Sequence, residues 1–204
     1  MPAMVIFAGC TGLSEQFIAH AVKYKLNIKA IAYSGYPPAA NTGKIAIQTA
    51  QQNGSPSLAN LNCPRLWIKP HGWREAEQAL GKLGANYFVS ICFLRMIPEK
   101  IRRLAHIACL NVHPSLLPAY RGPHPLFWQF KHAETNMGVS VHLMTDRLDS
   151  GAIVLQQRMP ELRLMPADRL DSALSATAVS MLVQIIKPAF KPELLPQNEQ
   201  GASY

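Results

Sequence analysis

Asn111 and His113 are the two side chains of this sequence whose types and spacing best suit chemistry. They lie two residues apart in a run, residues 107–113, that alternates as a β-strand does, so both are expected on one face. An amide can donate a hydrogen bond to an oxyanion, and an imidazole can move a proton near neutral pH. The same spacing also fits a structural histidine beside a turn-forming asparagine.

Two loops complete the candidate site. Residues 114–125 are rich in proline and contain Gly122, so the chain is expected to leave the strand as a stiff, shaped loop. Asp149 lies in a second polar loop, residues 145–151, between two strand-like runs. A carboxylate held against an imidazole fixes its tautomer and raises its basicity. We therefore predict a catalytic set of Asn111, His113 and Asp149, in which Asp149 raises the pKa of His113.

These motifs resemble those of the folate-dependent formyltransferases, the family of glycinamide ribonucleotide, methionyl-tRNA and amino-sugar formyltransferases. The resemblance rests on Asn-x-His-Pro-Ser-Leu-Leu-Pro at 111–118, Tyr-Arg-Gly at 120–122, Gly-Val at 138–139 and Leu-Asp-x-Gly at 148–151. It implies transfer of a formyl group from 10-formyltetrahydrofolate to a primary amine through a tetrahedral oxyanion. Neither a metal nor a covalent enzyme intermediate is expected.

The resemblance also implies roles for individual residues. Asn111 is expected to stabilise the oxyanion, and His113 to act as general acid or base. For residues 94, 96 and 97, core packing is the alternative interpretation. The residues expected at the folate are Arg95, Met96, Ile97, Ser115, Leu116, Leu117, Pro118, Asp146, Arg147 and Leu148. Those expected at the acceptor are Gly9, Thr11, Gly12 and Arg121.

The acceptor is predicted to be a small-molecule primary amine, with an amino sugar nucleotide ahead of glycinamide ribonucleotide. Residues 120–122 with Trp128 resemble the methionyl-tRNA and amino-sugar branches, whereas His113 followed by proline is common in the purine branch. Methionyl-tRNA is kept as a weaker alternative. Two other classes stay open: a hydrolase that releases formate from 10-formyltetrahydrofolate, and a folate-binding module without catalysis. The complete set of Asn111, His113 and Asp149 argues against the binding module.

Composition fits a compact protein expected in the cytoplasm. The chain has 204 residues, 49% of them hydrophobic, and its net charge of +8 favours anionic ligands such as a nucleotide, a polyglutamylated folate or tRNA. The basic residues are dispersed, however, which is typical of a solvated surface. Four cysteines without a C-x-x-C pair are expected to be reduced thiols, and the seven histidines have no metal-ligand spacing. No membrane segment is expected, because the N-terminal apolar run is far shorter than a membrane span.

The domain prediction is a catalytic domain of residues 1–188 followed by an extended tail of residues 189–204. The last residues, Gln-Asn-Glu-Gln-Gly-Ala-Ser-Tyr, resemble the sequence that precedes the second domain of methionyl-tRNA enzymes. We therefore expect either a trimmed chain or a short member of the family. The sequence does not indicate an oligomeric state.

Alternating strand and helix signals predict a doubly wound, mostly parallel Rossmann-like α/β sheet that ends in an antiparallel hairpin. Ser14 is expected to cap the first helix, Phe130 and Trp128 to lie in the core, and residues 34–43 to form a loop. Such sheets bind ligands at the carboxyl ends of their strands, where His113 falls. Strands are expected at 4–9, 28–33, 66–68, 87–92, 107–113, 138–144 and 153–159. Helices are expected at 15–25, 44–52, 73–83, after Pro98, at 124–130 and at 167–186.

Overall fold

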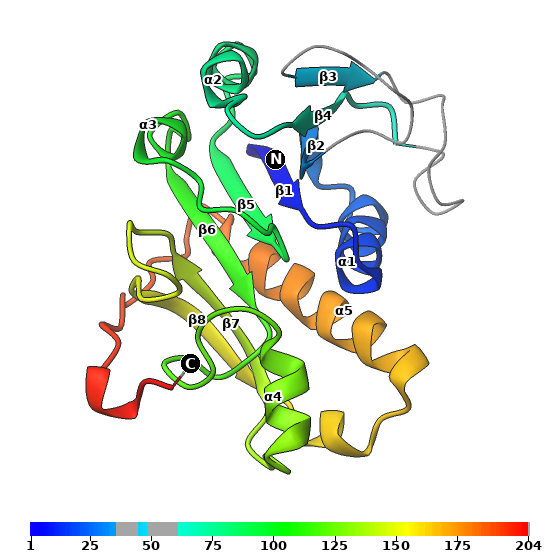
Figure 1. Cartoon of the computed structure of the whole chain (residues 1–204), viewed down its shortest axis with the longest axis vertical. Coiled ribbons are helices and arrows are strands. Elements are labelled where there is room, and N and C mark those ends of the chain that lie inside the picture. Colours follow the sequence, from blue (N-terminus) through cyan, green and yellow to red (C-terminus); the bar gives the residue numbers. More distant parts are fainter. Residues whose placement is uncertain (36–44, 49–60, 204) are drawn as a thin grey trace. The chain divides into compact units, whose positions relative to one another are not determined.

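The computed structural model describes residues 1–35, 45–48 and 61–203 (Figure 1). The chain forms two compact units, Met1–Cys109 and Leu110–Tyr204. Most of the predicted loop at 34–43 and the second half of the predicted helix at 44–52 lie outside the described residues. Among the helices that are described, none is long and apolar enough to cross a membrane.

The first unit is built on a mostly parallel sheet with the strand order β3-β4-β2-β1-β5. β1, β2, β4 and β5 run parallel, and β3 runs antiparallel to β4. All six residues of β1 are apolar and buried, as expected of a strand covered on both faces. The strands are β1 (Ala3–Ala8), β2 (Asn27–Ser34), β3 (Ile45–Gln48), β4 (Arg65–Ile68) and β5 (Tyr87–Ile91). The helices are α1 (Gly12–Lys23), α2 (Trp73–Gly81) and α3 (Glu99–Arg102).

The start of α1 corrects one prediction. Thr11, not Ser14, is the N-cap, and its hydroxyl accepts a hydrogen bond from the Ser14 backbone N–H at 3.2 Å. Ser14 is already inside the helix, and its buried hydroxyl donates to the Ile91 carbonyl. The helix therefore begins earlier than predicted. Before it, the chain passes close to the end of β5, since a Cβ on Gly9 would lie 2.1 Å from the Cys92 carbonyl oxygen. Only glycine fits there.

The helix predicted at 44–52 is wrong for its described part. Ile45–Gln48 forms β3, which pairs antiparallel with β4 so that Ile45 lies opposite Ile68 and Ile47 opposite Leu66. The alternation of Ile45 and Ile47 suits a strand as well as a short helix. Pairing with β4 therefore decides the conformation, a tertiary effect that overrides local preference.

The second unit contains antiparallel strands and the longest helix. β6 (Ala108–His113) pairs with β7 (Gly138–Leu143), and β7 pairs with β8 (Ile153–Arg158). α5 (Ala167–Ile185) packs against β7 and β8, and α4 (Pro125–Lys131) follows the proline-rich loop (Figure 1). The mostly parallel strands of the first unit and these antiparallel C-terminal strands confirm the predicted fold class.

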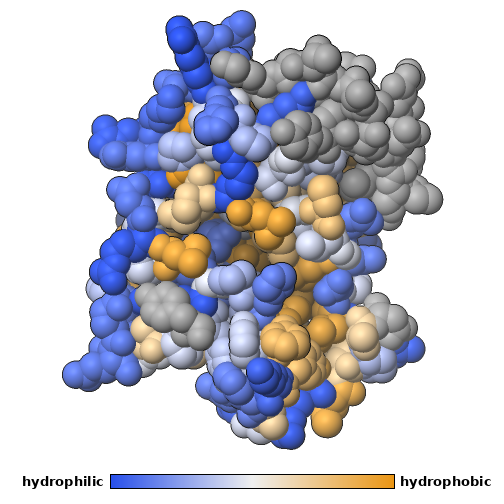
Figure 2. Space-filling view, in the orientation of Figure 1, coloured by the Kyte–Doolittle hydropathy of each residue, from blue (hydrophilic) through white to orange (hydrophobic). Residues whose placement is uncertain are grey.

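The exposed face of α4 differs from the prediction that both Trp128 and Phe130 lie in the core. Phe130 is 41% exposed, and the Lys131 ammonium lies 4.7 Å from the Trp128 ring. Figure 2 shows apolar residues at the surface, among polar ones, in the region of α4. Gln129 takes the buried position instead, and its amide donates to the Pro114 carbonyl at 2.7 Å. A polar anchor therefore fixes α4 to the proline-rich loop.

The segment after α5 has little regular structure but is attached to its unit. Leu195 and Ile153 exchange two backbone hydrogen bonds of 2.9 and 3.0 Å, and Glu199–Gly201 forms a 3-10 turn. It belongs to the second compact unit together with β6, β7 and β8. The division into a catalytic domain of 1–188 and a tail stays a prediction, because compactness does not show which residues catalysis requires.

Candidate active site

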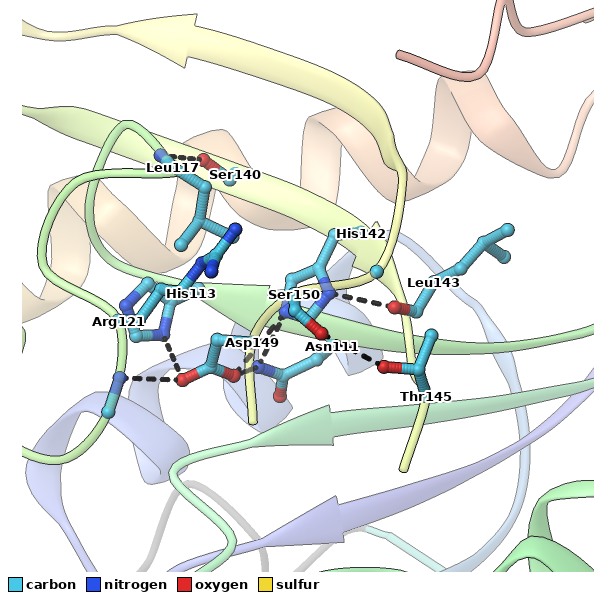
Figure 3. Close-up of polar contacts among 12 residues, drawn as sticks. Asn111, His113, Leu117, Arg121, Ser140, His142, Leu143, Thr145, Asp149 and Ser150 are labelled. Atoms are coloured by element: carbon cyan, nitrogen blue, oxygen red, sulfur yellow. Dashed lines mark hydrogen bonds and ion pairs between the residues drawn. The ribbon is translucent and has the colours of Figure 1, made fainter. Parts of the chain in front are cut away.

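The pairing of β6 with β7 brings polar side chains together on one face of the second unit (Figure 3). Asn111 and His113 alternate along β6, and the register places His142 opposite Asn111 and Ser140 opposite His113. Residues directly opposite each other in an antiparallel pair point to the same side. Strands from two distant parts of the sequence thus build one polar cluster.

Asp149 lies at the centre of this cluster. Asn111 Nδ2 donates to Asp149 Oδ1 at 3.1 Å, and the Gly122 backbone N–H donates to Oδ2 at 2.9 Å. His113 Nδ1 lies 3.6 Å from Oδ2, and His142 Nε2 lies 3.5 Å from Oδ1. The structure therefore brings together the predicted set of Asn111, His113 and Asp149, whose catalytic roles stay a prediction.

The turn that carries Asp149 is closed tightly. Asp149 itself adopts a left-handed backbone with φ of 46°, which aspartate tolerates better than most residues. Thr145 and Ser150 place their hydroxyl oxygens 3.2 Å apart across the turn. A Cβ on Gly151 would lie 1.8 Å from the Leu143 carbonyl oxygen, so a side chain cannot be accommodated. This explains why the turn needs an Asp-x-Gly sequence.

His113 is buried, with 4% of its surface exposed, and its hydrogen bonds define its tautomer. Its Nε2 lies 2.7 Å from the Tyr120 carbonyl oxygen, which can only accept, so Nε2 carries a proton. In the neutral ring Nδ1 therefore holds the lone pair and faces Asp149. A proton accepted at Nδ1 would form an ion pair with that carboxylate.

Burial lowers the pKa of His113, and this outweighs the raising effects of Asp149 and of the Tyr120 carbonyl. The contribution of Asp149 has the predicted direction, but the net pKa lies below the ordinary value of 6.5 because burial has the larger effect. For Asp149, burial raises the pKa. The neighbouring His142, His113 and Gly122 N–H together lower it by more than burial raises it. Its net pKa is below the ordinary value, so Asp149 is ionised at neutral pH.

His142 belongs to the cluster but was not singled out from the sequence. Its Nδ1 lies 2.8 Å from the Leu143 carbonyl oxygen and must donate, so in the neutral ring Nε2 accepts. Asn111 Nδ2 lies 3.1 Å from this Nε2. Both amide hydrogens of Asn111 thus have acceptors, one on His142 and one on Asp149. Only the β6–β7 register reveals this, because in sequence His142 is one polar residue in an apolar strand.

The loop after His113 is fastened by buried hydrogen bonds that involve two of the predicted folate residues, Ser115 and Leu117, whose contact with the folate stays a prediction. Ser140 Oγ donates to the Ser115 carbonyl at 2.6 Å and accepts from the Leu117 backbone N–H at 3.0 Å. Gln156 Nε2 donates to the Leu117 carbonyl at 2.7 Å. The Ser115 hydroxyl donates to the Ala119 carbonyl, and both predicted residues are buried. They hold the loop's shape in the structure.

The remaining folate candidates of the second unit are more accessible. Leu116 and Pro118 are half-buried. Asp146, Arg147 and Leu148 are exposed on the turn before Asp149, and Leu148 has 45% of its surface exposed. An exposed leucine on an ordered turn offers apolar surface to a ligand.

In the first unit, the loop after β5 offers one of its predicted side chains. Met96 is 44% exposed, whereas Ile97 is fully buried and packs in the core of that unit. Arg95 Nη1 donates to the Ile68 and Lys69 carbonyls at 3.1 and 3.0 Å. Arg95 therefore fastens the end of β4, which argues against a side-chain contact with the folate.

The acceptor candidates fall in both units. Thr11 and Gly12 are exposed at the N-terminus of α1, and Gly9 is buried beside Cys92. Arg121 is 2% exposed, and its guanidinium donates to the Gln197 and Glu199 side chains. These contacts occupy the guanidinium in the structure, and the acceptor role of Arg121 stays a prediction.

Among the residues that the structure describes, no three His, Cys, Asp or Glu side chains lie close enough to hold a metal ion. The cluster around Asp149 instead combines a carboxylate, an amide and an imidazole whose lone pair faces the carboxylate. Such a set can donate a hydrogen bond to an oxyanion and accept a proton.

Comparison with known proteins identifies the family. The model of the formyl transferase family matches residues 6–186, so the chain belongs to that family, as the resemblance implied. A methionyl-tRNA formyltransferase of Synechococcus sp. (strain JA-3-3Ab) is 36% identical over 132 residues, which cover 64% of this chain and 41% of the relative. That of Ehrlichia ruminantium (strain Gardel) is 24% identical over 205 residues, covering 98% and 65%. The chain thus spans less than two thirds of the length of these curated relatives.

Solved structures show the same fold. The phosphoribosylglycinamide formyltransferase of Bacillus halodurans is similar with a TM-score of 0.64 at 18% identity, covering 93% of this chain and 100% of that one. The methionyl-tRNA formyltransferase of Clostridium thermocellum has a TM-score of 0.63 at 12% identity, with coverages of 98% and 70%. At such identities the likeness concerns the fold and does not resolve the acceptor.

Proposed function

We propose that this protein transfers a formyl group from 10-formyltetrahydrofolate to a primary amine, with Asn111, His113 and Asp149 as the catalytic residues. The supporting observation is the Asp149 carboxylate, which contacts an amide donor at 3.1 Å and faces the lone pair of a buried imidazole at 3.6 Å. This is the arrangement that acyl transfer to an amine requires: an oxyanion donor and a base that work at neutral pH.

His113 acts as the base. Its pKa lies below 6.5, so the ring is neutral at pH 7 and Nδ1 can accept a proton from the attacking amine. The imidazolium then forms an ion pair with Asp149, which is already ionised. General base catalysis of this kind contributes about 10² to 10⁴ in rate.

Asn111 supplies the oxyanion donor. Both of its amide hydrogens have acceptors in the structure, on Asp149 and on His142. One of them is released to the oxyanion as negative charge develops there, because a charged acceptor forms the stronger hydrogen bond. A donor of this kind contributes about 10² to 10³ in rate.

The formyl group of bound 10-formyltetrahydrofolate is carried as an amide on N10. When the C–N10 bond breaks, the His113 imidazolium returns its proton to the departing nitrogen, so that tetrahydrofolate leaves as a secondary amine. In the second unit, the exposed side chain of Leu148 presents apolar surface beside Asp149 and suits the flat ring system of the folate. In the first unit, the exposed side chain of Met96 is a candidate of its own. Asp146 and Arg147 are the exposed polar groups beside Leu148. Leu116 and Pro118, which are half-buried, are the remaining candidates for contact with the folate.

The first candidate acceptor is a small-molecule primary amine such as an amino sugar nucleotide, held near Gly9, Thr11 and Gly12. Thr11 and Gly12 expose backbone at the start of α1, where a phosphate would find N–H donors. Methionyl-tRNA is the second candidate, because the curated relatives are named for it and the net charge is +8. We place the reaction in the cytoplasm.

The experiment is a release assay with 10-formyltetrahydrofolate, alone and with amino sugar nucleotides, glycinamide ribonucleotide or charged methionyl-tRNA. We expect tetrahydrofolate to form only when an acceptor is present. The acceptor that supports this reaction identifies the substrate class. Equal formate release without any acceptor would instead make the protein a hydrolase.

A second arm tests the mechanism with His113→Ala. We expect turnover to fall by about 10² to 10⁴ while folate binding, followed by fluorescence titration, is kept. The matched control is His106→Ala, which removes an exposed histidine of the first unit. Near-normal turnover of His113→Ala would reject His113 as the base.

A further inference from the structure

The side chain of Gln197 joins the two loops that surround His113. Its Nε2 donates to the carbonyls of Asp149 at 2.8 Å and of Gly151 at 2.7 Å. Its Oε1 accepts from Nε and Nη2 of Arg121 at 3.0 and 2.9 Å. Both hydrogens and both lone pairs of this amide are therefore used.

Further contacts fix the segment of residues 197–203, which we call the clamp segment. Glu199 binds Arg121 at 3.1 Å, and Arg147 Nη2 lies 3.6 Å from the same carboxylate. Ser203 accepts at its Oγ from the Tyr120 N–H and at its carbonyl from the Arg121 N–H, both at 2.8 Å. The clamp segment thus holds the loop whose Tyr120 carbonyl binds His113 and the turn that carries Asp149.

The hydrogen bonds that close the turn of Asp149 join Thr145, Arg147 and Ser150 to one another and do not tie the turn to the loop at Arg121. Residues 145–148 are exposed, and Asp149 adopts a left-handed backbone. Gln197 binds the carbonyls on either side of Ser150, so it fixes the direction in which the Asp149 side chain leaves the backbone. A displacement of about 1 Å at a catalytic group can cost about a hundredfold in rate.

We propose that Gln197 is a positioning residue, which holds the Asp149 turn against Arg121 and so sets the contacts of Asp149 with His113 and Asn111. The proposal rests on the proposed function for its effect on rate, but its structural part concerns the Gln197–Asp149 contact alone.

The sharpest test compares Gln197→Glu with Gln197→Ala. The glutamate keeps oxygens that accept from Arg121, but it loses the amide donor and places a charged oxygen against the carbonyls of Asp149 and Gly151. If Gln197 only anchors Arg121, glutamate will substitute well and alanine will not. If Gln197 positions Asp149, both variants will fail. Gln200→Ala is the matched control, because Gln200 is an exposed glutamine of the same segment.

We expect Gln197→Glu to lower kcat by about 10- to 100-fold and to change KM for 10-formyltetrahydrofolate by less than about threefold. Gln200→Ala is expected to keep both constants. A wild-type kcat in Gln197→Glu would overturn the proposal.

Hydrogen exchange at the Gly122 amide separates this proposal from the proposed function. That amide donates to Asp149 Oδ2, so its protection reports the position of the carboxylate whatever reaction is catalysed. We expect exchange about tenfold faster in Gln197→Glu than in the wild type or Gln200→Ala. Unchanged protection would overturn the positioning role even if kcat falls. A wild-type protein without acceptor-dependent activity would reject the proposed function and leave the exchange result to decide the role of Gln197.

Discussion

β1 of the first unit and the pair of β6 and β7 in the second unit bury different kinds of side chain. β1 of the first unit has an unbroken apolar sequence in which every residue is buried. β6 and β7 of the second unit bury His113, Ser140 and His142 at 4%, 0% and 2% exposure. A buried polar group without a hydrogen bond costs about 1 to 3 kcal/mol, so such residues add little to stability unless they are paired. The apolar strand therefore serves stability, and we propose that the polar strands serve catalysis.

The pairing in the second unit supports this distinction. Ser140 holds the loop at Ser115 and Leu117, and Asn111 and His142 meet at Asp149. The hydrogen bonds of Asn111 and His142 converge near Asp149, and those of Ser140 fix the loop after His113. Substitutions in the two units should therefore separate loss of activity from loss of stability.

Asp149→Asn should give the largest effect. Asparagine keeps the shape and tolerates the left-handed backbone, but it cannot stabilise an imidazolium at His113. We expect kcat to fall by about 10² to 10⁴ with circular dichroism unchanged. Asp171→Asn, a half-buried aspartate on α5, is the control and should keep kcat. A kcat within about twofold of wild type in Asp149→Asn would show that the polar cluster is structural.

Phe7→Ala should give the opposite pattern in the first unit. Phe7 is fully buried, and its ring centroid lies 5.3 Å from that of Phe88. We expect the free energy of unfolding, measured in urea, to fall by about 3 to 5 kcal/mol, while the folded fraction keeps its specific activity. Phe127→Ala, at an aromatic residue with 59% exposure, should change stability by less than about 0.5 kcal/mol. Equal losses in the two variants would contradict the assignment of core and surface.

The smallest effect concerns pH. The pKa of His113 is below 6.5 in the folded protein, so the unfolded chain binds more protons between that pKa and 6.5. Stability should therefore fall as the pH drops through 6.5, by at most about 1.4 kcal/mol per pH unit for one proton. Asp149 acts in the same direction at lower pH, since its pKa is below 3.8. Urea unfolding between about pH 5.5 and 7.5 should show a weaker pH dependence in His113→Gln. An identical dependence would mean that His113 is not buried in its neutral form.

Local pattern was enough to predict most of the fold. The apolar run of β1 and the alternation of β7 are recorded in neighbouring residues, so their strands could be predicted without knowing their partners. The edge strand β3 was mistaken for a helix, because its conformation depends on pairing with β4. The N-cap of α1 is Thr11 rather than the predicted Ser14, because two hydroxyl residues lie near its start and only the folded backbone shows which one precedes the first turn.

By itself the sequence determined the family, the strand that carries Asn111 and His113, and Asp149 as their partner, because these follow from short motifs and two-residue spacing. Only the tertiary structure decided the rest. The register of β6 and β7 places His142 in the cluster. The guanidinium of Arg121 donates to the side chain of Gln197, which is 76 residues away in sequence. The net pKa of His113 follows from burial competing with Asp149. Register, long-range hydrogen bonds and burial are properties of the folded chain, and no local pattern contains them.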